Sequence, residues 1–269
     1  MSYSFFKVDI KEKIATVSFN KPEKSNALAM EDWREMKLVF EDLDAQSEVR
    51  VIVLKGEGKN FCAGIDINTL GGLMQAEGND EGRKRERLYR SLLELQSCIT
   101  AIESCRKPVL AAIHRACIGG GVDIIAACDM RYCSEDAYFS IREIDMGLVA
   151  DIGTLQRLPT VLNPGILAEM AYTGRNVMAE EAAQIGLVNR AYPSQEAMMT
   201  AVYEIAHTIA SKSPLVIRGI KQHLLYKRDH TVADSLQNIA SWNAATLLSN
   251  DLMEAMQAYM QKRTASFGD

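Results

Sequence analysis

The sequence predicts an α/β fold in which strands and helices alternate over the first part of the chain and helices dominate the rest. Short, wholly apolar runs such as 51–54 are typical of buried parallel strands. Between such runs, apolar residues recur at helical spacing, as they do over 29–44. From about Asn163 onward the pattern is almost entirely helical. With 269 residues, the chain is long enough to bury a large core.

The elements of the first part follow from local patterns. Strands are expected over 5–10 and 14–20, and the polar residues 11–13 between them indicate a hairpin. A helix over 29–44 comes next. The same criteria then predict a strand at 51–54, a glycine-containing loop at 56–66, a helix at 82–104, a strand at 109–113, a helix that opens at 119–121 and ends near 128–129, and strands at 130–133 and 138–141.

The helical part of the chain is divided by prolines and small residues. Pro164, Pro193 and Pro214 each stand where a helix can begin, because proline is tolerated in the first turn. We therefore expect two parts, a core over residues 1–195 and a C-terminal helical region over 196–269. The segment 71–85 is rich in glycine, amide and charged residues and is expected to be mobile.

Composition excludes several kinds of site. The net charge of −5 provides no overall basic field for nucleic acid, so no nucleic-acid partner is expected. The basic cluster at 83–90 also contains acidic residues and fits a solvated helix face better than an RNA site. The six cysteines and four histidines lack metal-ligand spacing, so the cysteines are expected to be buried apolar residues and no metal is expected.

The sequence also bears on location. No run approaches the roughly 18 apolar residues of a membrane span, so no membrane partner is expected. The N-terminal residues resemble neither an export signal nor a transit peptide, and the C-terminal residues are not Ser-Lys-Leu. These features predict a cytoplasmic protein.

Two glycine-containing turns are candidate ligand sites. One is Phe61-Cys-Ala-Gly-Ile-Asp66 and the other is Cys117-Ile-Gly-Gly-Gly-Val-Asp123. Glycines at a helix start leave backbone N–H groups free and let a ligand approach the main chain closely. Taken alone, either turn fits a purely structural strand-to-helix connection better than a ligand site.

One carboxylate ends the second turn, and two more follow it. Asp123, Glu143 and Asp151 each lie among aliphatic residues, where desolvation raises a carboxyl pKa toward neutrality and permits proton transfer. Each also has a structural alternative. Asp123 could be a first-turn helix residue, Glu143 could pair with Arg142 or Arg157, and Asp151 could cap a helix.

Several segments together resemble the crotonase superfamily, which is also called the enoyl-CoA hydratase/isomerase family. The matching segments are 20–28, 61–66, 119–123 and 153–158, and the resemblance extends from about residue 5 to residue 258. It implies an α/β spiral of strand-strand-helix units with a helical C-terminal trimerisation region. It also implies homotrimers or homohexamers that act on acyl-CoA thioesters.

The resemblance assigns roles to the two turns. The backbone N–H groups of Ile65 and Gly120 would form an oxyanion hole that holds the enolate of the thioester, and such donors supply a large part of catalysis. Coenzyme A would be part of the substrate, so no separate cofactor is expected. The implied substrate-binding residues are Ala63, Gly64, Ile65, Asp66, Ile67 and Gly120.

The three acids resemble the dienoyl-CoA isomerase branch of this family. The implied activity is isomerisation of 3,5-dienoyl-CoA to 2,4-dienoyl-CoA in fatty-acid β-oxidation. Glu143 would remove the C2 proton, Asp151 would donate a proton to C6, and Asp123 would be a polar support. A hydratase, in which Asp123 and Glu143 share a water, is the alternative enzyme. An RNA-binding or scaffold homologue is the alternative without catalysis.

One residue departs from the pattern of this branch. Arg115 stands beside the second turn, where the family usually has a small residue. The sequence leaves open its effect, the acyl-chain length and the residues that contact the CoA phosphates. Candidates for these contacts are Lys24 and the basic residues late in the chain.

Overall fold

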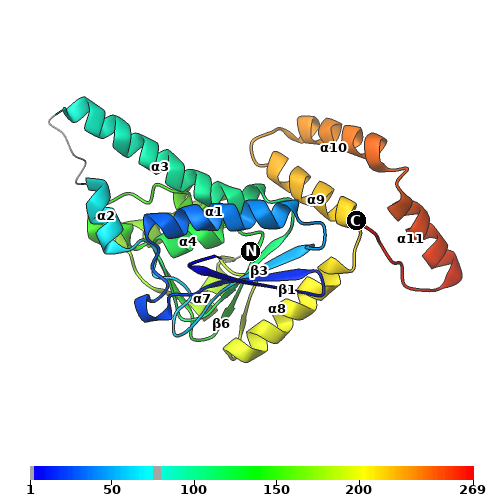
Figure 1. The fold of residues 1–269 in the computed structure, drawn as a ribbon, viewed down its shortest axis with the longest axis horizontal. Coiled ribbons are helices and arrows are strands. Elements are labelled where there is room, and N and C mark those ends of the chain that lie inside the picture. The colour runs from blue at the N-terminus through cyan, green and yellow to red at the C-terminus, as the bar shows by residue number, and fades with distance from the viewer. Residues whose placement is uncertain (1–2, 75–79) are drawn as a thin grey trace.

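The strands form two sheets, as seen in a computed structural model that describes residues 3–74 and 80–269 (Figure 1). The larger sheet contains, in spatial order, β1 (Phe6–Lys11), β2 (Ile14–Phe19), β3 (Val51–Gly56), β4 (Val109–Ile113), β6 (Met130–Ser134) and β9 (Arg190–Tyr192). The smaller sheet contains β5 (Ala116–Ile118), β7 (Tyr138–Ser140) and β8 (Val177–Met178). The predicted hairpin is confirmed, since β1 and β2 pair antiparallel, and all later pairs of the larger sheet are parallel.

The larger sheet is covered on both faces, which explains the wholly apolar strand at 51–54. Successive side chains of a strand point to opposite faces. Ile52 and Leu54 therefore face the main core, whereas Val51 and Val53 face a second core. The helices α1 (Met30–Ala45), α3 (Glu81–Ser104) and α4 (Gly120–Ala126) lie on the first side, and α8 (Gln195–Ala210) packs on β3, β4 and β6 from the other (Figure 1).

The structure corrects several expectations about secondary structure. The chain beyond Asn163 is not all helical, because β8 and β9 complete the two sheets between α6 (Pro164–Thr173), α7 (Ala179–Gln184) and α8. These strands have two and three residues, too few to show a period. The strand β5 and the helix α2 (Ile67–Met74) were not predicted either. Residues 71–74 and 81–85 of the segment expected to be mobile are helical, and 75–79 lie outside the described residues.

Four short elements complete the spiral around the site. They are η1 (Pro22–Lys24), η2 (Arg142–Met146), α5 (Thr154–Arg157) and η3 (Leu158–Thr160). The six cysteines are buried and free, as expected of small apolar residues. Among the helices of residues 3–74 and 80–269, none is long and apolar enough to cross a membrane.

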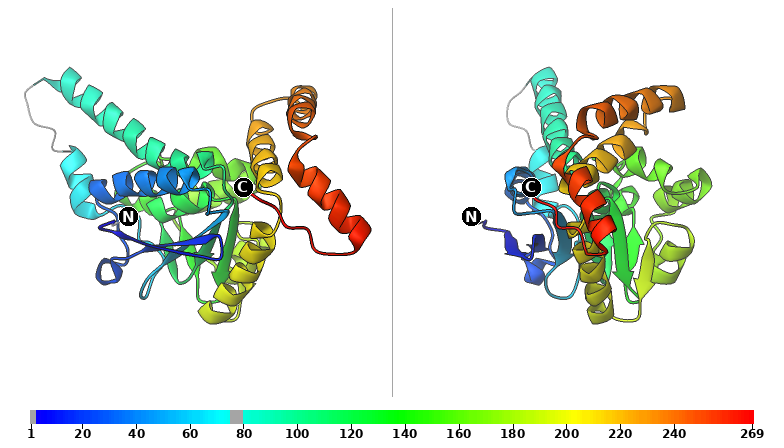
Figure 2. Two further views of the ribbon diagram at one scale, coloured as in Figure 1. Left: turned by 45° about the vertical axis from the view of Figure 1, so that its right-hand side comes forward. Right: turned by 90° about the vertical axis from the view of Figure 1, so that its right-hand side faces the viewer.

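The last three helices extend away from the rest of the molecule (Figures 1 and 2). They are α9 (Pro214–Tyr226), α10 (Val232–Thr246) and α11 (Asn250–Gln261). Gly219 of α9 lets Trp242 of α10 pack closely, since a Cβ there would lie 2.6 Å from the indole nitrogen. The helix α8 still packs on the larger sheet. The helices that extend away from the sheet therefore begin after α8, and not at the expected boundary at residue 195. The two-part division of the chain stays a prediction.

Candidate active site

The two glycine-containing turns lie against each other. Cys62 N–H donates to the Ala116 carbonyl at 3.0 Å, and Ile118 N–H donates to the Cys62 carbonyl at 3.1 Å. Gly64 has a φ of +84°, and a Cβ on it would lie 2.8 Å from the Gly120 nitrogen. Glycine is therefore required here both by the left-handed backbone and by the close approach of the second turn.

Two N–H groups at this junction are free to bind a ligand. Among the described residues, the N–H groups of Ile65 and Gly120 make no hydrogen bond. The Gly120 N–H is free because it belongs to the first turn of α4. The neighbouring Asp66 N–H, in contrast, donates to the Leu28 carbonyl at 2.8 Å. Two unpaired donors therefore lie at this junction, and the oxyanion hole that the sequence resemblance implied stays a prediction.

Glu143 lies beside the second turn. It belongs to η2, and its Oε1 is 3.3 Å from the position that a Cβ on Gly119 would occupy. Gly119 has a φ of +53°, and its N–H donates to the Ser140 carbonyl at 2.9 Å, which ties the turn to the end of β7. The other carboxylate oxygen, Oε2, is buried without a hydrogen-bond partner. Burial, together with the charges of Asp123 and Asp151, raises the pKa of Glu143 to about 7.

Asp123 lies deeper, in the first turn of α4, with no exposed surface. Its Oδ1 accepts a hydrogen bond from the Thr154 N–H at 2.6 Å, and its Oδ2 is buried without a partner. Burial raises the pKa of Asp123 to about 6, although the Thr154 hydrogen bond opposes this rise. The carboxylate thereby joins the start of α4 to the start of α5.

Asp151 is the most exposed of the three acids and lies in a segment without regular structure. Its backbone carbonyl accepts a hydrogen bond of 2.8 Å from the Gln96 side chain of α3. Partial burial raises the pKa of Asp151. The three acids thus occupy three environments, from fully buried to solvent-exposed, and all three pKa values are shifted upward.

The purely structural roles considered for the three acids account for little of this arrangement. Arg142 pairs with Asp145 at 3.5 Å and Arg157 with Glu103 at 3.0 Å, so neither neutralises Glu143. The N-cap of α5 is Gly153 and not Asp151. Only the first-turn placement of Asp123 in α4 matches its structural alternative. Buried, unpaired carboxylates with raised pKa values are typical of functional sites.

The remaining predicted binding residues line the first turn. The Ala63 N–H donates to the Ser25 carbonyl, and Ile67 is largely exposed at the start of α2. The Asp66 carboxylate accepts from the Asn68 N–H at 2.8 Å and lies 3.6 Å from the Lys24 ammonium. The backbone hydrogen bond from Asn68 lowers the pKa of Asp66. Asp66 is thus an anion that holds the entry to α2, and its role toward a ligand stays a prediction.

Two residues of the site were missed by sequence reasoning. Thr154 supplies the N–H that holds Asp123, and Trp33 of α1 supports Gly120, where a Cβ would lie 2.9 Å from the indole ring. The Gly153-Thr154 pair is a recognisable helix-start signal, but nothing in the sequence around Trp33 links it to residue 120. Within residues 3–74 and 80–269, no group of three or more His, Cys, Asp or Glu side chains could hold a metal.

The basic cluster on α3 is largely compensated by its own surroundings. Arg83 pairs with Asp80, Lys84 with Glu81, and Arg90 with Glu86, each within one helical turn. Pairs at this spacing are typical of a solvated helix face. This is the interpretation that the sequence favoured over an RNA site.

Comparison with known proteins identifies relatives of this site and fold. The family model for enoyl-CoA hydratase/isomerase matches residues 9–269. A peroxisomal Δ(3,5)-Δ(2,4)-dienoyl-CoA isomerase of Arabidopsis thaliana is 48% identical over 92% of this chain and 90% of its own. The mitochondrial Δ(3,5)-Δ(2,4)-dienoyl-CoA isomerase of Homo sapiens is 43% identical over 97% of this chain and 81% of its own.

A solved structure shares the whole fold. The enoyl-CoA hydratase of Bacillus anthracis superposes with a TM-score of 0.87 at 27% identity, covering 98% of this chain and 99% of that one. The predicted spiral of strand-strand-helix units is thereby confirmed.

The same relatives correct the expected location. The prediction of a cytoplasmic protein is wrong, because these relatives are named as peroxisomal and mitochondrial. A targeting address is a short segment read by a receptor, so the composition of the folded part carries no information about it.

The fold, the paired turns and the match over residues 9–269 agree with one another. This chain belongs to the enoyl-CoA hydratase/isomerase family, the crotonase superfamily.

Proposed function

We propose that this protein isomerises 3,5-dienoyl-CoA to 2,4-dienoyl-CoA. The observation that carries the proposal is the set of three interacting carboxylates, Asp123, Glu143 and Asp151, beside two free N–H groups. The names of the relatives from Arabidopsis and man support the same reaction. The reaction belongs to the oxidation of unsaturated fatty acids, and coenzyme A enters as part of the substrate.

The first step removes a proton from C2. Glu143, with a pKa near 7, is deprotonated in a large fraction of molecules at neutral pH and accepts this proton. The electron pair of the C–H bond moves into the dienolate, whose negative charge spreads over the thioester oxygen, C2, C4 and C6. The N–H groups of Ile65 and Gly120 donate to the oxygen, where charge develops in the transition state.

The second step adds a proton at C6. Donor and acceptor carbons are four atoms apart, so one carboxylate cannot serve both without large movement. Asp151 donates the C6 proton and becomes a carboxylate, while Glu143 is left protonated. The substrate gains and loses one proton, and no electrons are exchanged. For the next turnover Glu143 releases its proton to water and the solvent-exposed Asp151 takes one up, so both carboxyl groups return to their starting states.

Asp123 orients and tunes this pair. Its charge raises the pKa of Glu143. Its hydrogen bond to Thr154 also fixes the end of the segment that carries Asp151.

A hydratase is the second candidate, since Asp123 and Glu143 could hold one water. One oxygen of Asp123 is already committed to the Thr154 N–H, and a hydratase gives no role to Asp151. These two observations favour the isomerase.

Two variants test the assignment. Glu143→Gln is expected to abolish both formation of the 2,4-diene, followed by absorbance, and exchange of the C2 hydrogen with deuterated water. Asp151→Asn is expected to retain C2 exchange and to lose product formation by roughly 10²–10⁴, the size of a general-acid contribution.

Three results would contradict this function. They are normal diene formation by Asp151→Asn, loss of C2 exchange in Asp151→Asn as complete as in Glu143→Gln, and faster hydration of a 2-enoyl-CoA than isomerisation of the diene by the unaltered protein.

We further propose that the protein assembles as a homotrimer or homohexamer through its C-terminal helices. The helix α10 contains no buried residue, and α11 contains only Ala258. Apolar side chains such as Leu224, Leu236 and Leu248 are 63–94% exposed. An exposed apolar surface of this kind is uncommon on a monomer.

A further inference from the structure

The segment that carries Asp151 is packed through its neighbours Ala150 and Ile152, which are buried in the main core. It follows a left-handed glycine, Gly147, and has no regular structure before α5 begins at Thr154. The Asp151 side chain is exposed and accepts no hydrogen bond from another described residue. A proton donor must nevertheless be held within a fraction of an ångström of its target to be effective. The position of Asp151 therefore depends on the groups that fix the backbone on either side of it.

The guanidinium of Arg157 packs directly on this segment. A Cβ on Gly153 would lie 2.0 Å from Arg157 Nη1, so the guanidinium occupies the space of the missing side chain. Gly153 also has a φ of +147°, which favours glycine. Nη1 lies 3.5 Å from the Ile152 carbonyl. Arg157 thereby contacts the two residues that directly follow Asp151.

Arg157 is itself fixed by one face of α3. Its Nη2 donates to Thr100 Oγ1 at 3.3 Å and to Glu103 Oε2 at 3.0 Å. Gln96, which donates to the Asp151 carbonyl, lies one turn before Thr100 on the same face. The Arg157 and Glu103 side chains are only 13% and 18% exposed, so this ion pair is shielded from water. Shielding makes it stronger than an exposed pair.

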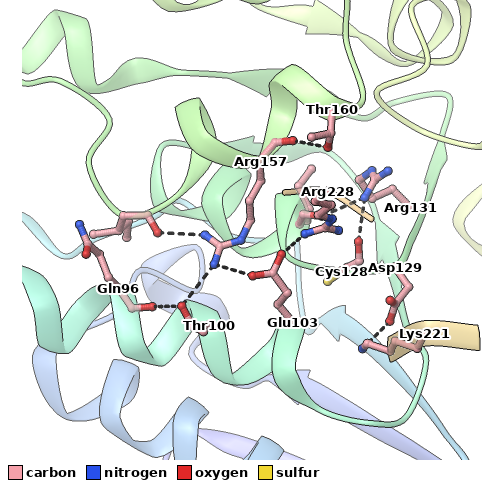
Figure 3. A network of polar contacts seen from close by, with 12 residues as sticks. Gln96, Thr100, Glu103, Cys128, Asp129, Arg131, Arg157, Thr160, Lys221 and Arg228 are labelled. Carbon is pink, nitrogen blue, oxygen red and sulfur yellow. Dashed lines mark hydrogen bonds and ion pairs between the residues drawn. The ribbon is translucent and has the colours of Figure 1, made fainter. Parts of the chain in front are cut away.

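The same glutamate also connects the segment to the C-terminal helices. The second oxygen of Glu103 pairs with Arg228, which directly follows α9 and its C-cap (Figure 3). One carboxylate therefore bridges the segment of Asp151 and the end of α9.

We propose that Arg157 is a positioning residue for proton delivery, which holds the 151–153 segment against α3 through Glu103 and Thr100. The proposal rests on the proposed isomerase function. Arg157 does not touch the substrate; it acts on Asp151 through the backbone of Ile152 and Gly153. Its loss should impair protonation at C6 more than removal of the C2 proton, because Glu143 lies on η2 and is not held by this network.

The test compares two rates in the same variants. In Arg157→Gln, formation of the 2,4-diene is expected to fall by about 10², a loss that a displacement of about 1 Å can cause. Exchange of the C2 hydrogen with deuterated water should stay near the rate of the unaltered protein. Arg157→Lys keeps the charge but not the forked geometry. Its rate of diene formation should lie between that of Arg157→Gln and that of the unaltered protein.

A matched control separates positioning from general destabilisation. Arg34 of α1 also pairs with a glutamate of α3, Glu94, at 2.7 Å. Arg34→Gln should leave both rates unchanged. Should Arg157→Gln fail to fold, Gln96→Met removes only the amide donor to the Asp151 carbonyl, at a half-buried helix position. It should lower diene formation but not C2 exchange, on a smaller scale.

Each outcome decides between the proposals. The positioning role is overturned if diene formation and C2 exchange fall equally in Arg157→Gln and Gln96→Met. It is also overturned if neither variant loses either rate. Absence of both diene formation and C2 exchange in the unaltered protein instead overturns the proposed function.

Discussion

Asp123 shows how a single residue of the site costs stability. Its carboxyl is completely buried, and one oxygen has no hydrogen-bond partner. Its pKa of about 6 in the folded protein exceeds the ordinary value near 3.9 of an unfolded chain. The folded state therefore binds more protons than the unfolded state between these two values. Stability consequently falls as the pH rises through about 6.

Replacement of Asp123 by asparagine tests how much the buried charge lowers the free energy of unfolding. At about pH 8, Asp123→Asn should raise the free energy of unfolding by roughly 2–3 kcal/mol, because each pKa unit corresponds to about 1.4 kcal/mol. The amide oxygen can still accept from the Thr154 N–H. At about pH 4 the carboxyl is protonated and the gain should nearly vanish. Urea unfolding of both proteins at the two pH values measures this gain in the free energy of unfolding. An equal effect at both values would mean that the charge of Asp123 is irrelevant to folding.

Gly64 tests the oxyanion hole at the residue scale. A methyl group on this residue would lie 2.8 Å from both the Gly120 nitrogen and the Ile118 carbonyl oxygen. Gly64→Ala should therefore displace one proposed donor and reduce turnover by about 10²–10³. The control is Gly165→Ala on α6, where the nearest atom is 3.4 Å away. Turnover near the normal rate in a folded Gly64→Ala protein would show that the turn is only structural.

At the scale of elements, α8 stabilises the sheet from the side opposite the site. Val202 and Ala206 of α8 are completely buried, in a core that also contains Val51 and Val53 of β3. The site residues Cys62, Cys117 and Val122 belong to the core on the other face. Changes in α8 should therefore affect stability without affecting catalysis.

The N-cap of α8 tests this separation. The Ser194 hydroxyl accepts a hydrogen bond of 3.1 Å from the Ala197 N–H. Ser194→Ala should lower the free energy of unfolding by about 1 kcal/mol, whereas Ser194→Asn, another good cap, should lose much less. The rate of diene formation should stay unchanged in both variants. A large loss of rate in Ser194→Ala, with the protein folded, would connect α8 to the site.

At the scale of the whole molecule, the C-terminal helices need a partner for their apolar surface. A groove of about 450 Å³ lies between α9, α10 and α11 and is lined by Ile220, Trp242 and Leu252, among others. Light scattering at micromolar concentration should give three or six times the chain mass of 29.8 kDa. Leu236→Asp, on the exposed face of α10, should lower that mass because a charge cannot be buried unpaired. A monomer in the unaltered protein would contradict the proposed assembly.

The sequence alone determined most of the elements and the kind of chemistry. Strands such as 51–54 and 109–113 could be predicted because burial on both faces leaves an uninterrupted apolar run. The acids Asp123, Glu143 and Asp151 could be selected because a carboxylate in an aliphatic run is unusual unless it is used. The strands β8 and β9 could not be predicted, because they exist only as partners of β7 and β6.

Only the tertiary structure decided how these residues act together. The free N–H groups of Ile65 and Gly120 become a pair because Gly64 allows two distant turns to touch. The pKa of Glu143 depends on charges 20 residues before it and 8 after it, which no local pattern encodes. Thr154 and Arg157 gain their roles from contacts with Asp123 and with α3. Local sequence specifies which groups are present, whereas distances between them, and hence their electrostatics, are fixed by packing over the whole chain.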